Sequence, residues 1–264
     1  MKAAEQNPKS EIRSPKEARI PKSESVAAVV AVSDFGFPSD FGARISDFTL
    51  WQLADSAFPT GGFAHSAGLE AAWQHGEVRG RTQLASFLEA SLQQAGHAML
   101  PFALASFDEP DRLNEFDRLC DAFTTNHVAN RASRSQGQAL LASAERIFGA
   151  PTLQLLRQAP DHQPPHGHFA PLFGIVARAL GLDRRQSARL FFFQHLRGLC
   201  ASAVRLNIVG PFEAQALQFQ LGPRAEAIQA ECERLSLDEI AQTAPLLEVW
   251  QGAHDRLYSR LFQS

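Results

Sequence analysis

From Ile45 onward, the apolar residues recur with the period of an α-helix, and this periodicity restricts the fold more than any other sequence feature. The segment that follows Asp183 shows it well, because its apolar residues fall at i, i+3, i+4, i+7 and i+8: Leu196, Leu199, Cys200, Ala203 and Val204. Such spacing places them on one buried helix face. Strand-like alternation is nearly absent, and no internal repeat is found. We therefore predict an all-α fold with a single helical-bundle domain.

Glycine, proline and capping residues indicate where these helices begin and end. Helices are expected over 48–57, 82–99, 111–124, 126–148 and 169–180, and after Asp183, Gly210 and Ala244. Thr82 is expected to cap the second of them. Asp183 with Gln186, and Ser236 with Glu239, have the spacing of a capping box. The pair Gly222-Pro223 is expected to break the helix that begins at Pro211.

The first part of the chain differs from the rest. Residues 1–44 carry few large apolar groups and repeated prolines, so they cannot offset the entropy lost on ordering. We predict a disordered polar extension over 1–44 and one helical domain over 45–264. The extension also carries several glutamates, which transit peptides avoid.

Composition excludes several classes of function. The net charge is −3 and charges of both signs are mixed along the chain, which argues against nucleic acid as the main partner. No apolar run is long enough to span a membrane. The cysteines, Cys120, Cys200 and Cys232, are far apart and form no CxxC motif, as expected in a reducing compartment. We expect a cytoplasmic protein.

The densest motif covers residues 55–70, where Pro59-Thr-Gly61-Gly62 predicts a tight turn between two helices. Ser66 with His65 could form the nucleophile and base of a serine hydrolase. A nucleophile elbow, however, needs a strand before the serine and βα units after it, and neither pattern is present. A packed or hydrogen-bonded Ser66 and His65 fits the sequence better. The segment from Gly76 to Thr82 is one residue too short for a phosphate loop and carries Arg in place of its Lys.

Three histidines lie in a proline-rich loop over 158–168. His162, His166 and His168 could bind nickel or zinc, since short-spaced loop histidines are plausible ligands. The only other ligand type at suitable spacing is Asp161. The alternative is a solvated, proline-stiffened loop, so we assign no fixed metal ligand.

The predicted helix 126–148 has an unusually polar middle. Arg131 and Arg134 are at i and i+3, on one face. Gly137 interrupts the helix at a cost of up to ~1 kcal/mol relative to Ala, which predicts close approach of another backbone. Gly198 raises the same expectation in its own helix.

The last residues, 254–264, combine aromatic and arginine side chains, which are typical of interface anchors. In a helix, Tyr258 and Phe262, Leu257 and Leu261, and Arg256 and Arg260 would form i, i+4 pairs. The segment is predicted either to dock a partner or to pack on the core as a final helix.

Four segments together resemble one family, the urease accessory protein UreF. They are Phe58–Glu70 (FPTGGFAHSAGLE), Asn130–Gly137 (NRASRSQG), His168–Gly174 (HFAPLFG) with Ala203–Leu206, and Tyr258–Ser264 (YSRLFQS). Their order matches the family from about Phe48 to Ser264. The first and last segments are the most specific. The extension 1–44 and the histidine-rich loop depart from the family pattern.

The resemblance implies an all-helical homodimer without enzymatic activity or a tightly bound cofactor. It implies binding to the accessory protein UreD, called UreH in some organisms, and to the GTPase UreG, with nickel in transit to apo-urease. Residues expected at partner surfaces are Gly62, Phe63, His65, Ser66, Glu70, Arg131, Arg134, Arg205, Tyr258, Arg260, Leu261 and Phe262. His65 and His168 are expected near a nickel route. The alternatives are the serine hydrolase and a histidine-loop nickel-binding protein.

Overall fold

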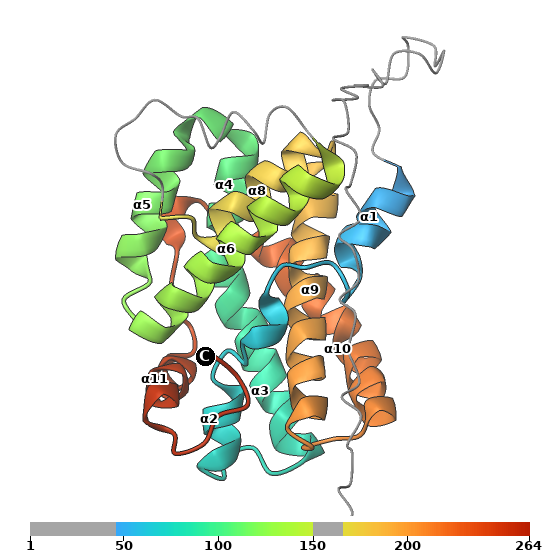
Figure 1. Ribbon diagram of the computed structural model, residues 1–264, viewed down its shortest axis with the longest axis vertical. Coiled ribbons are helices and arrows are strands. Elements are labelled where there is room, and N and C mark those ends of the chain that lie inside the picture. The colour runs from blue at the N-terminus through green and yellow to red at the C-terminus, as the bar shows by residue number, and fades with distance from the viewer. Residues whose placement is uncertain (1–45, 150–165) are drawn as a thin grey trace, which may run out of the picture. The chain divides into compact units, whose positions relative to one another are not determined.

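The computed structural model of the protein describes residues 46–149 and 166–264, and these are all-α, without a strand among them (Figure 1). The helices are α1 (Asp47–Ala54), α2 (Leu69–Gln74), α3 (Arg81–Gln94), α4 (Leu100–Asp108), α5 (Leu113–Phe123), α6 (His127–Phe148), α8 (Phe169–Ala179), α9 (Arg184–Arg205), α10 (Pro211–Cys232) and α11 (Pro245–Ala253). Residues 43–264 form one compact unit. The predicted extension 1–44 lies outside the described residues.

Several helix ends follow from local sequence chemistry as predicted. The side chain of Asn126 accepts hydrogen bonds from the N–H groups of Val128 and Ala129 and so caps α6. Gly149 follows α6 with φ at +61°, a conformation that glycine adopts at little cost. Asp183 and Gln186 form the expected capping box at the start of α9.

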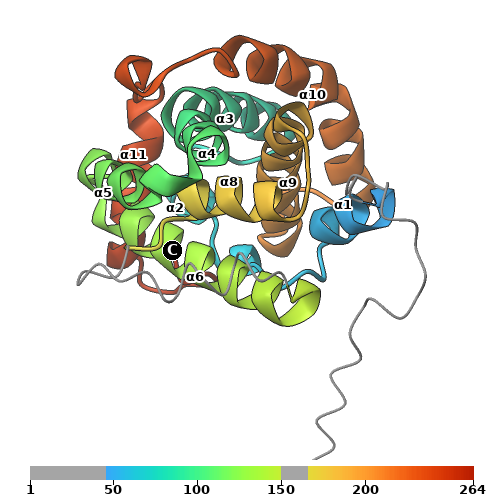
Figure 2. The ribbon, with the colours of Figure 1, turned by 90° about the horizontal axis from the view of Figure 1, so that it is seen from above.

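Two predicted boundaries are wrong. Helix α10 runs through Gly222-Pro223 without a break and curves around the side of the bundle that α3 and α9 form (Figure 2). A proline inside a helix removes one hydrogen bond and bends it, and here buried residues on both sides of Pro223 hold the two halves on the core. Thr82 does not cap α3, because the helix begins at Arg81 and its N-cap is Gly80, two residues before Thr82.

The helix expected to end near Met99 instead continues into α4. A single π-helical turn, Ala95–Met99, joins α3 to α4. Such a turn places one extra residue in a helix. Pro101 then lies at the start of α4, where the N–H that proline lacks costs little. The joined segment passes through the middle of the bundle.

The core is built around α4 and α8, with α6 and α9 against them (Figure 2). A Cβ on Gly174 of α8 would lie 1.9 Å from the carbonyl oxygen of Ala103, so only glycine permits this close crossing. A Cβ on Gly137 of α6 would lie 2.2 Å from the carbonyl oxygen of Gly167. The close approach predicted at Gly137 is therefore confirmed. The same prediction is wrong for Gly198, where a Cβ would meet nothing within 4 Å beyond the neighbouring backbone of its own helix.

Among the described residues, no helix is both long enough and apolar enough to cross a membrane.

Candidate functional site

The Pro-Gly-Gly segment forms a tight turn between α1 and α2, as predicted. Gly61 has φ at +74° and Gly68 has φ at +86°, and a short 3-10 turn, Gly62–Ala64, lies between them. Ala67 also has positive φ, at +51°, which is uncommon for a residue with a Cβ. These conformations turn the chain so that residues 63–66 face the carboxy-terminal segment.

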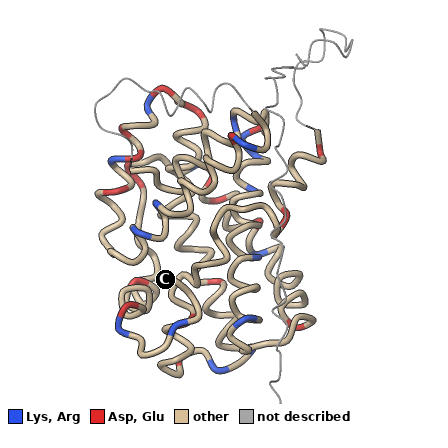
Figure 3. Tube along the Cα trace, in the orientation of Figure 1, with Lys and Arg blue, Asp and Glu red and all other residues tan. Residues whose placement is uncertain are grey.

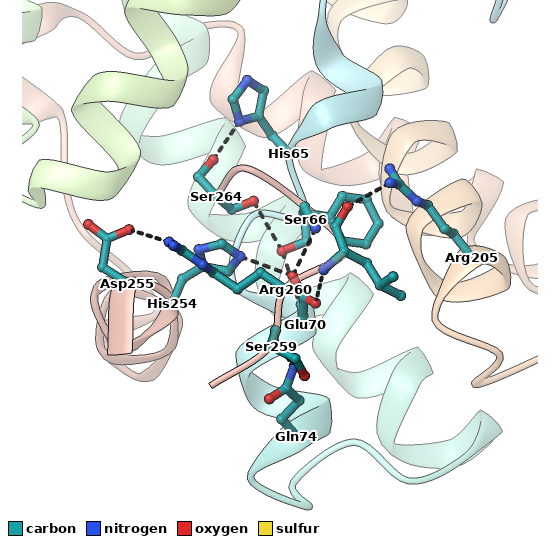
Figure 4. Close-up of polar contacts among 12 residues, drawn as sticks. His65, Ser66, Glu70, Gln74, Arg205, His254, Asp255, Ser259, Arg260 and Ser264 are labelled. Atoms are coloured by element: carbon teal, nitrogen blue, oxygen red, sulfur yellow. Dashed lines mark hydrogen bonds and ion pairs between the residues drawn. The ribbon is translucent and has the colours of Figure 1, made fainter. Parts of the chain in front are cut away.

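That segment, Leu257–Ser264, is not helical, and the predicted i, i+4 pairs do not form. After α11 a 3-10 turn, His254–Arg256, ends in extended backbone at Leu257. The chain then runs back over α2 and the turn (Figure 4). We call Leu257–Ser264 the tail. The N–H groups of Leu261, Phe262 and Gln263 find acceptors outside the tail, and this satisfies them without a helix.

The carboxylate of Glu70 holds the middle of the tail. It accepts hydrogen bonds from the N–H groups of Leu261 (2.6 Å) and Phe262 (3.2 Å), and it contacts Nε2 of His254 at 3.0 Å (Figure 4). Glu70 and His254 are fully buried. Burial of a carboxylate is costly unless it is hydrogen-bonded, and these contacts meet that requirement.

The end of the tail pairs with the turn. The N–H of Gln263 donates to the carbonyl of Ala64, and the N–H and Oγ of Ser66 both donate to the carbonyl of Ser264. His65 Nδ1 hydrogen-bonds Oγ of Ser264. The turn and the tail are thus one continuous hydrogen-bonded structure.

Arg205, at the end of α9, adds a second connection. Its guanidinium carbon lies 4.7 Å from the ring centroid of Phe63 and 4.4 Å from that of Phe262, so it makes cation–π contacts with the turn and with the tail. It also donates hydrogen bonds to the carbonyls of Phe63 and Leu261.

The residues predicted to bind partners divide into two groups. Phe63, Arg131, Arg134, Arg205, Tyr258, Arg260 and Leu261 are exposed, and Gly62 and His65 are partly so. Ser66, Glu70 and Phe262 are buried within the chain. These three hold the tail in place, so the surface offered to another protein consists of the exposed members. Whether that surface binds a partner stays a prediction.

The geometry does not support the serine hydrolase alternative. Ser66 Oγ donates to the carbonyl of Ser264, whereas His65 bonds the side chain of Ser264, so the two are not arranged as nucleophile and base. Ser66 is also fully buried. Burial, followed by the charges of Arg131 and His254, lowers the pKa of His65 to about 4.

His168 has a structural environment rather than an open metal site. Its Nε2 lies 3.0 Å from the carboxylate of Asp121, which can only accept, so Nε2 carries the proton. Because burial favours the neutral imidazole, Nδ1 accepts from Oγ of Ser133 at 3.1 Å, and the same oxygen accepts the N–H of Phe169. With both nitrogens engaged, His168 has no lone pair for a metal in this arrangement. Burial is the main cause that lowers its pKa.

The other histidines of the loop are less defined. His166 is partly exposed, with Nδ1 at 3.8 Å from Asp121, and His162 lies outside the described residues. Within 46–149 and 166–264, no three or more side chains of His, Cys, Asp or Glu come together as metal ligands would. The three cysteines are buried and unbridged.

Comparisons with known proteins agree with the motifs. The sequence profile of the UreF family matches residues 78–222. Urease accessory protein F of Oryza sativa subsp. indica is 40% identical over 219 residues, which cover 81% of this chain and 84% of that protein. Its counterpart in Arabidopsis thaliana is 39% identical over 221 residues, 82% of this chain and 92% of that protein. The chain belongs to the UreF family.

A third relative, an uncharacterized urease accessory protein UreF-like of Schizosaccharomyces pombe, is 30% identical over 224 residues, 80% of this chain and 94% of that protein. The family predicted from four short motifs is therefore confirmed over most of the chain.

A cavity of about 550 Å³ opens beside the turn of this UreF-family chain. Phe63, His65 and Ser264 line one part of it, and Ser91 and His195 line another. His195 Nε2 lies 2.8 Å from Oγ of Ser91. Burial lowers the pKa of His195 to about 4, so the imidazoles of His65 and His195 are both neutral at pH 7. Gly198 also borders the cavity, which explains why no atom lies near it.

Sequence reasoning singled out the segment 254–264 but not the individual roles of His254 and Ser264, and it missed Gln74. Gln74 donates to the carbonyl of Ser259 at 2.8 Å, and the other two have the contacts described above. All three act across more than 180 residues of chain. The only available signal was their position inside the two most specific motifs or next to them.

Proposed function

We propose that this chain is a urease accessory protein that scaffolds nickel insertion into apo-urease. On this proposal it binds UreD (UreH) and the GTPase UreG, and UreG hydrolyses the GTP. The observation that carries the proposal is family membership, with 40% identity to a protein named urease accessory protein F over 81% of this chain. The chain acts without catalysis of its own, in the cytoplasm.

The exposed part of the tail is the surface that we assign to UreD. Tyr258 is fully exposed and Leu261 is about half exposed, at 52%. Beside them Arg260 is also exposed. Exposed aromatic, aliphatic and arginine groups side by side are typical of residues that dominate binding energy. Because Glu70 and Arg205 hold the backbone at Leu261, and Gln74 holds it at Ser259, these side chains need little further ordering on binding.

The turn offers a second surface, centred on Phe63, which is 72% exposed. The guanidinium of Arg205 lies over its ring. We propose that this surface also accepts a partner chain of the assembly. Because Arg205 contacts both Phe63 and the tail residues Leu261 and Phe262, the two surfaces are close to each other.

A homodimer is supported by exposed apolar residues on α1 and α9. Phe48 and Trp51 are 75% and 61% exposed, and their rings contact each other edge to face. Helix α1 lies along α9, where Gln194 donates to the carbonyl of Leu53, and Phe193 of α9 is exposed as well. Large apolar groups clustered at a surface mark protein interfaces. We propose that a second copy covers them.

Nickel in transit is the proposed cargo, and His65 is the residue that we place near its route. Its imidazole is neutral at pH 7 and borders the cavity, and neutral imidazole is a good ligand for nickel. His168 was an equal candidate from sequence, but both of its nitrogens are engaged. His65 is proposed as a passing contact, not as a fixed ligand.

The test is reconstitution with purified partners. The chain is mixed with UreD and UreG, and the complex is isolated by size exclusion. It is then added with GTP and nickel to apo-urease. We expect a ternary complex and urease activation that depends on this chain. If neither UreD nor UreG co-elutes, or if activation is the same without the chain, the proposal is wrong.

A further inference from the structure

A groove follows the solvent-facing side of α6, and two arginines line it. Its volume is about 610 Å³. Arg131, Arg134 and His127 line it, and its remaining lining consists of neutral groups that can form hydrogen bonds, among them Thr125 and Gln138. A groove of this size with several convergent polar groups is suited to a ligand or an extended chain.

Asp255 is the carboxylate that faces this groove from the neighbouring 3-10 turn. It contacts Arg131 with both oxygens, at 2.8 and 3.2 Å. It also contacts Nε2 of His127 at 3.2 Å and Arg260 at 3.3 Å. One carboxylate is therefore shared by two guanidinium groups and an imidazole, and positive charge remains in excess.

Arg134 has a weaker attachment. Its Nε donates to the carbonyl of His166 at 3.3 Å, and no carboxylate among the described residues forms an ion pair with it. Its side chain is exposed. Asp121 lies near this end of the groove but is engaged by Asn130 and His168. The terminal nitrogens of Arg134 are thus available to an incoming acidic group.

The kind of cation also matters. Every lysine of the chain lies within its first 22 residues, so the basic groups of the described surface are arginines and histidines. Arginine presents a planar fork that matches a carboxylate with two hydrogen bonds. The bidentate contact of Arg131 with Asp255 shows that a carboxylate fits this position.

We propose that this groove binds an acidic segment of a partner protein. One carboxylate of the segment would pair with Arg134, and a second would replace Asp255 at Arg131. The proposal rests on the proposed function only for the identity of that partner. Nucleic acid fits less well, because basic and acidic positions are interspersed along the part of the trace that is coloured by charge (Figure 3) and the net charge is −3.

The direct test uses a fluorescein-labelled hexaglutamate peptide and fluorescence anisotropy with the full chain. We expect saturable binding that weakens as salt rises. Arg131→Glu with Arg134→Glu should weaken binding by roughly tenfold or more, since charge-assisted contacts are the strong ones. The matched control is Arg118→Glu with Arg185→Glu, which changes two other exposed arginines and should bind as the unchanged chain does. Circular dichroism establishes that both variants are folded.

A second variant separates docking from general attraction. Asp255→Asn removes the internal carboxylate that competes for Arg131, so it should bind the peptide more tightly than the unchanged chain. Equal weakening in both arginine pairs, or weaker binding by Asp255→Asn, would overturn the proposal. So would tighter binding of a single-stranded RNA of equal charge, which would indicate a nucleic-acid site. None of these measurements needs UreD, UreG or urease, so their outcome is independent of the reconstitution.

Discussion

The carboxylate of Glu70 meets the imidazole of His254 at 3.0 Å in the interior of the protein, with side chains 1% and 0% exposed. The same carboxylate accepts two backbone N–H groups of the tail. Glu70 therefore links α2 to the end of α11 and to the tail, and it makes the tail part of the folded structure.

Replacement of this carboxylate should loosen the tail. Glu70→Gln keeps the size of the side chain but leaves one buried N–H without its acceptor, so we expect a loss of about 1–3 kcal/mol in the free energy of unfolding. Urea denaturation measures the loss, and hydrogen exchange should show faster exchange at Leu261 and Phe262. Glu77→Gln, at an exposed position of the same region, is the control. Unchanged exchange in the tail would contradict the assigned role.

Two tail residues should respond in opposite ways. Phe262 is 5% exposed, so Phe262→Ala should cost about 3–5 kcal/mol of stability. Tyr258 is fully exposed, so Tyr258→Ala should leave stability within about 0.5 kcal/mol and weaken the binding of UreD. Thermal unfolding and a pull-down with UreD measure both. Deletion of 258–264 would combine the two effects, and for that reason the point variants are the sharper experiment.

Two glycines provide a matched pair in helix interiors. Gly137→Ala would push a Cβ against the carbonyl of Gly167, and we expect destabilisation of about 1–3 kcal/mol. Gly198→Ala meets no atom within 4 Å and gains helix propensity, so it should stabilise by up to about 1 kcal/mol. Midpoints of thermal unfolding give the sign of each change. Equal shifts of the unfolding midpoint in the two variants would mean that helix propensity alone determines the change in stability.

Stability should fall between pH 6.5 and pH 4. His65 and His195 have pKa values lowered to about 4 from the usual 6.5. Over this range the unfolded chain binds protons that the folded chain does not, so the free energy of unfolding decreases as pH falls. For His195 we expect on the order of 1–2 kcal/mol, because its ring borders a cavity that water can enter. His195→Gln should flatten the profile in urea denaturation at pH 7 and pH 4.5, and an unchanged slope would exclude His195 as a cause.

The histidine-loop alternative needs a variant that spares the fold. His162→Ala with His166→Ala leaves His168 and its bonds to Ser133 and Asp121 in place. If the loop binds nickel, calorimetric titration should show weaker affinity in this variant. His65→Ala is the comparison for nickel near the cavity. Equal affinity of the loop variant and the unchanged chain would rule out the loop.

Local sequence determined most of the helical segments and where most of them begin, but α2 and α4 had not been predicted as helices of their own. Caps such as Asn126 and Asp183 act within a few residues, so they can be read from the chain alone. The close backbone approach at Gly137 could also be predicted, because a glycine inside a helix lowers stability and a close contact accounts for its presence. The family could be identified from short motifs of unusual composition.

Tertiary structure alone decided the path through Pro223 and the conformation of the tail. Buried contacts on both sides of Pro223 outweigh the local cost of a proline in α10. The tail residues have helical spacing, yet Glu70, Ser66 and Ala64 bind the backbone of residues 261–264 in a non-helical form. Those partners lie nearly 200 residues away along the chain, and no local pattern encodes which distant group will accept a hydrogen bond. Local preferences are worth tenths of a kcal/mol to about 1 kcal/mol per residue, whereas buried packing and buried hydrogen bonds are worth more, so the fold prevails where the two disagree.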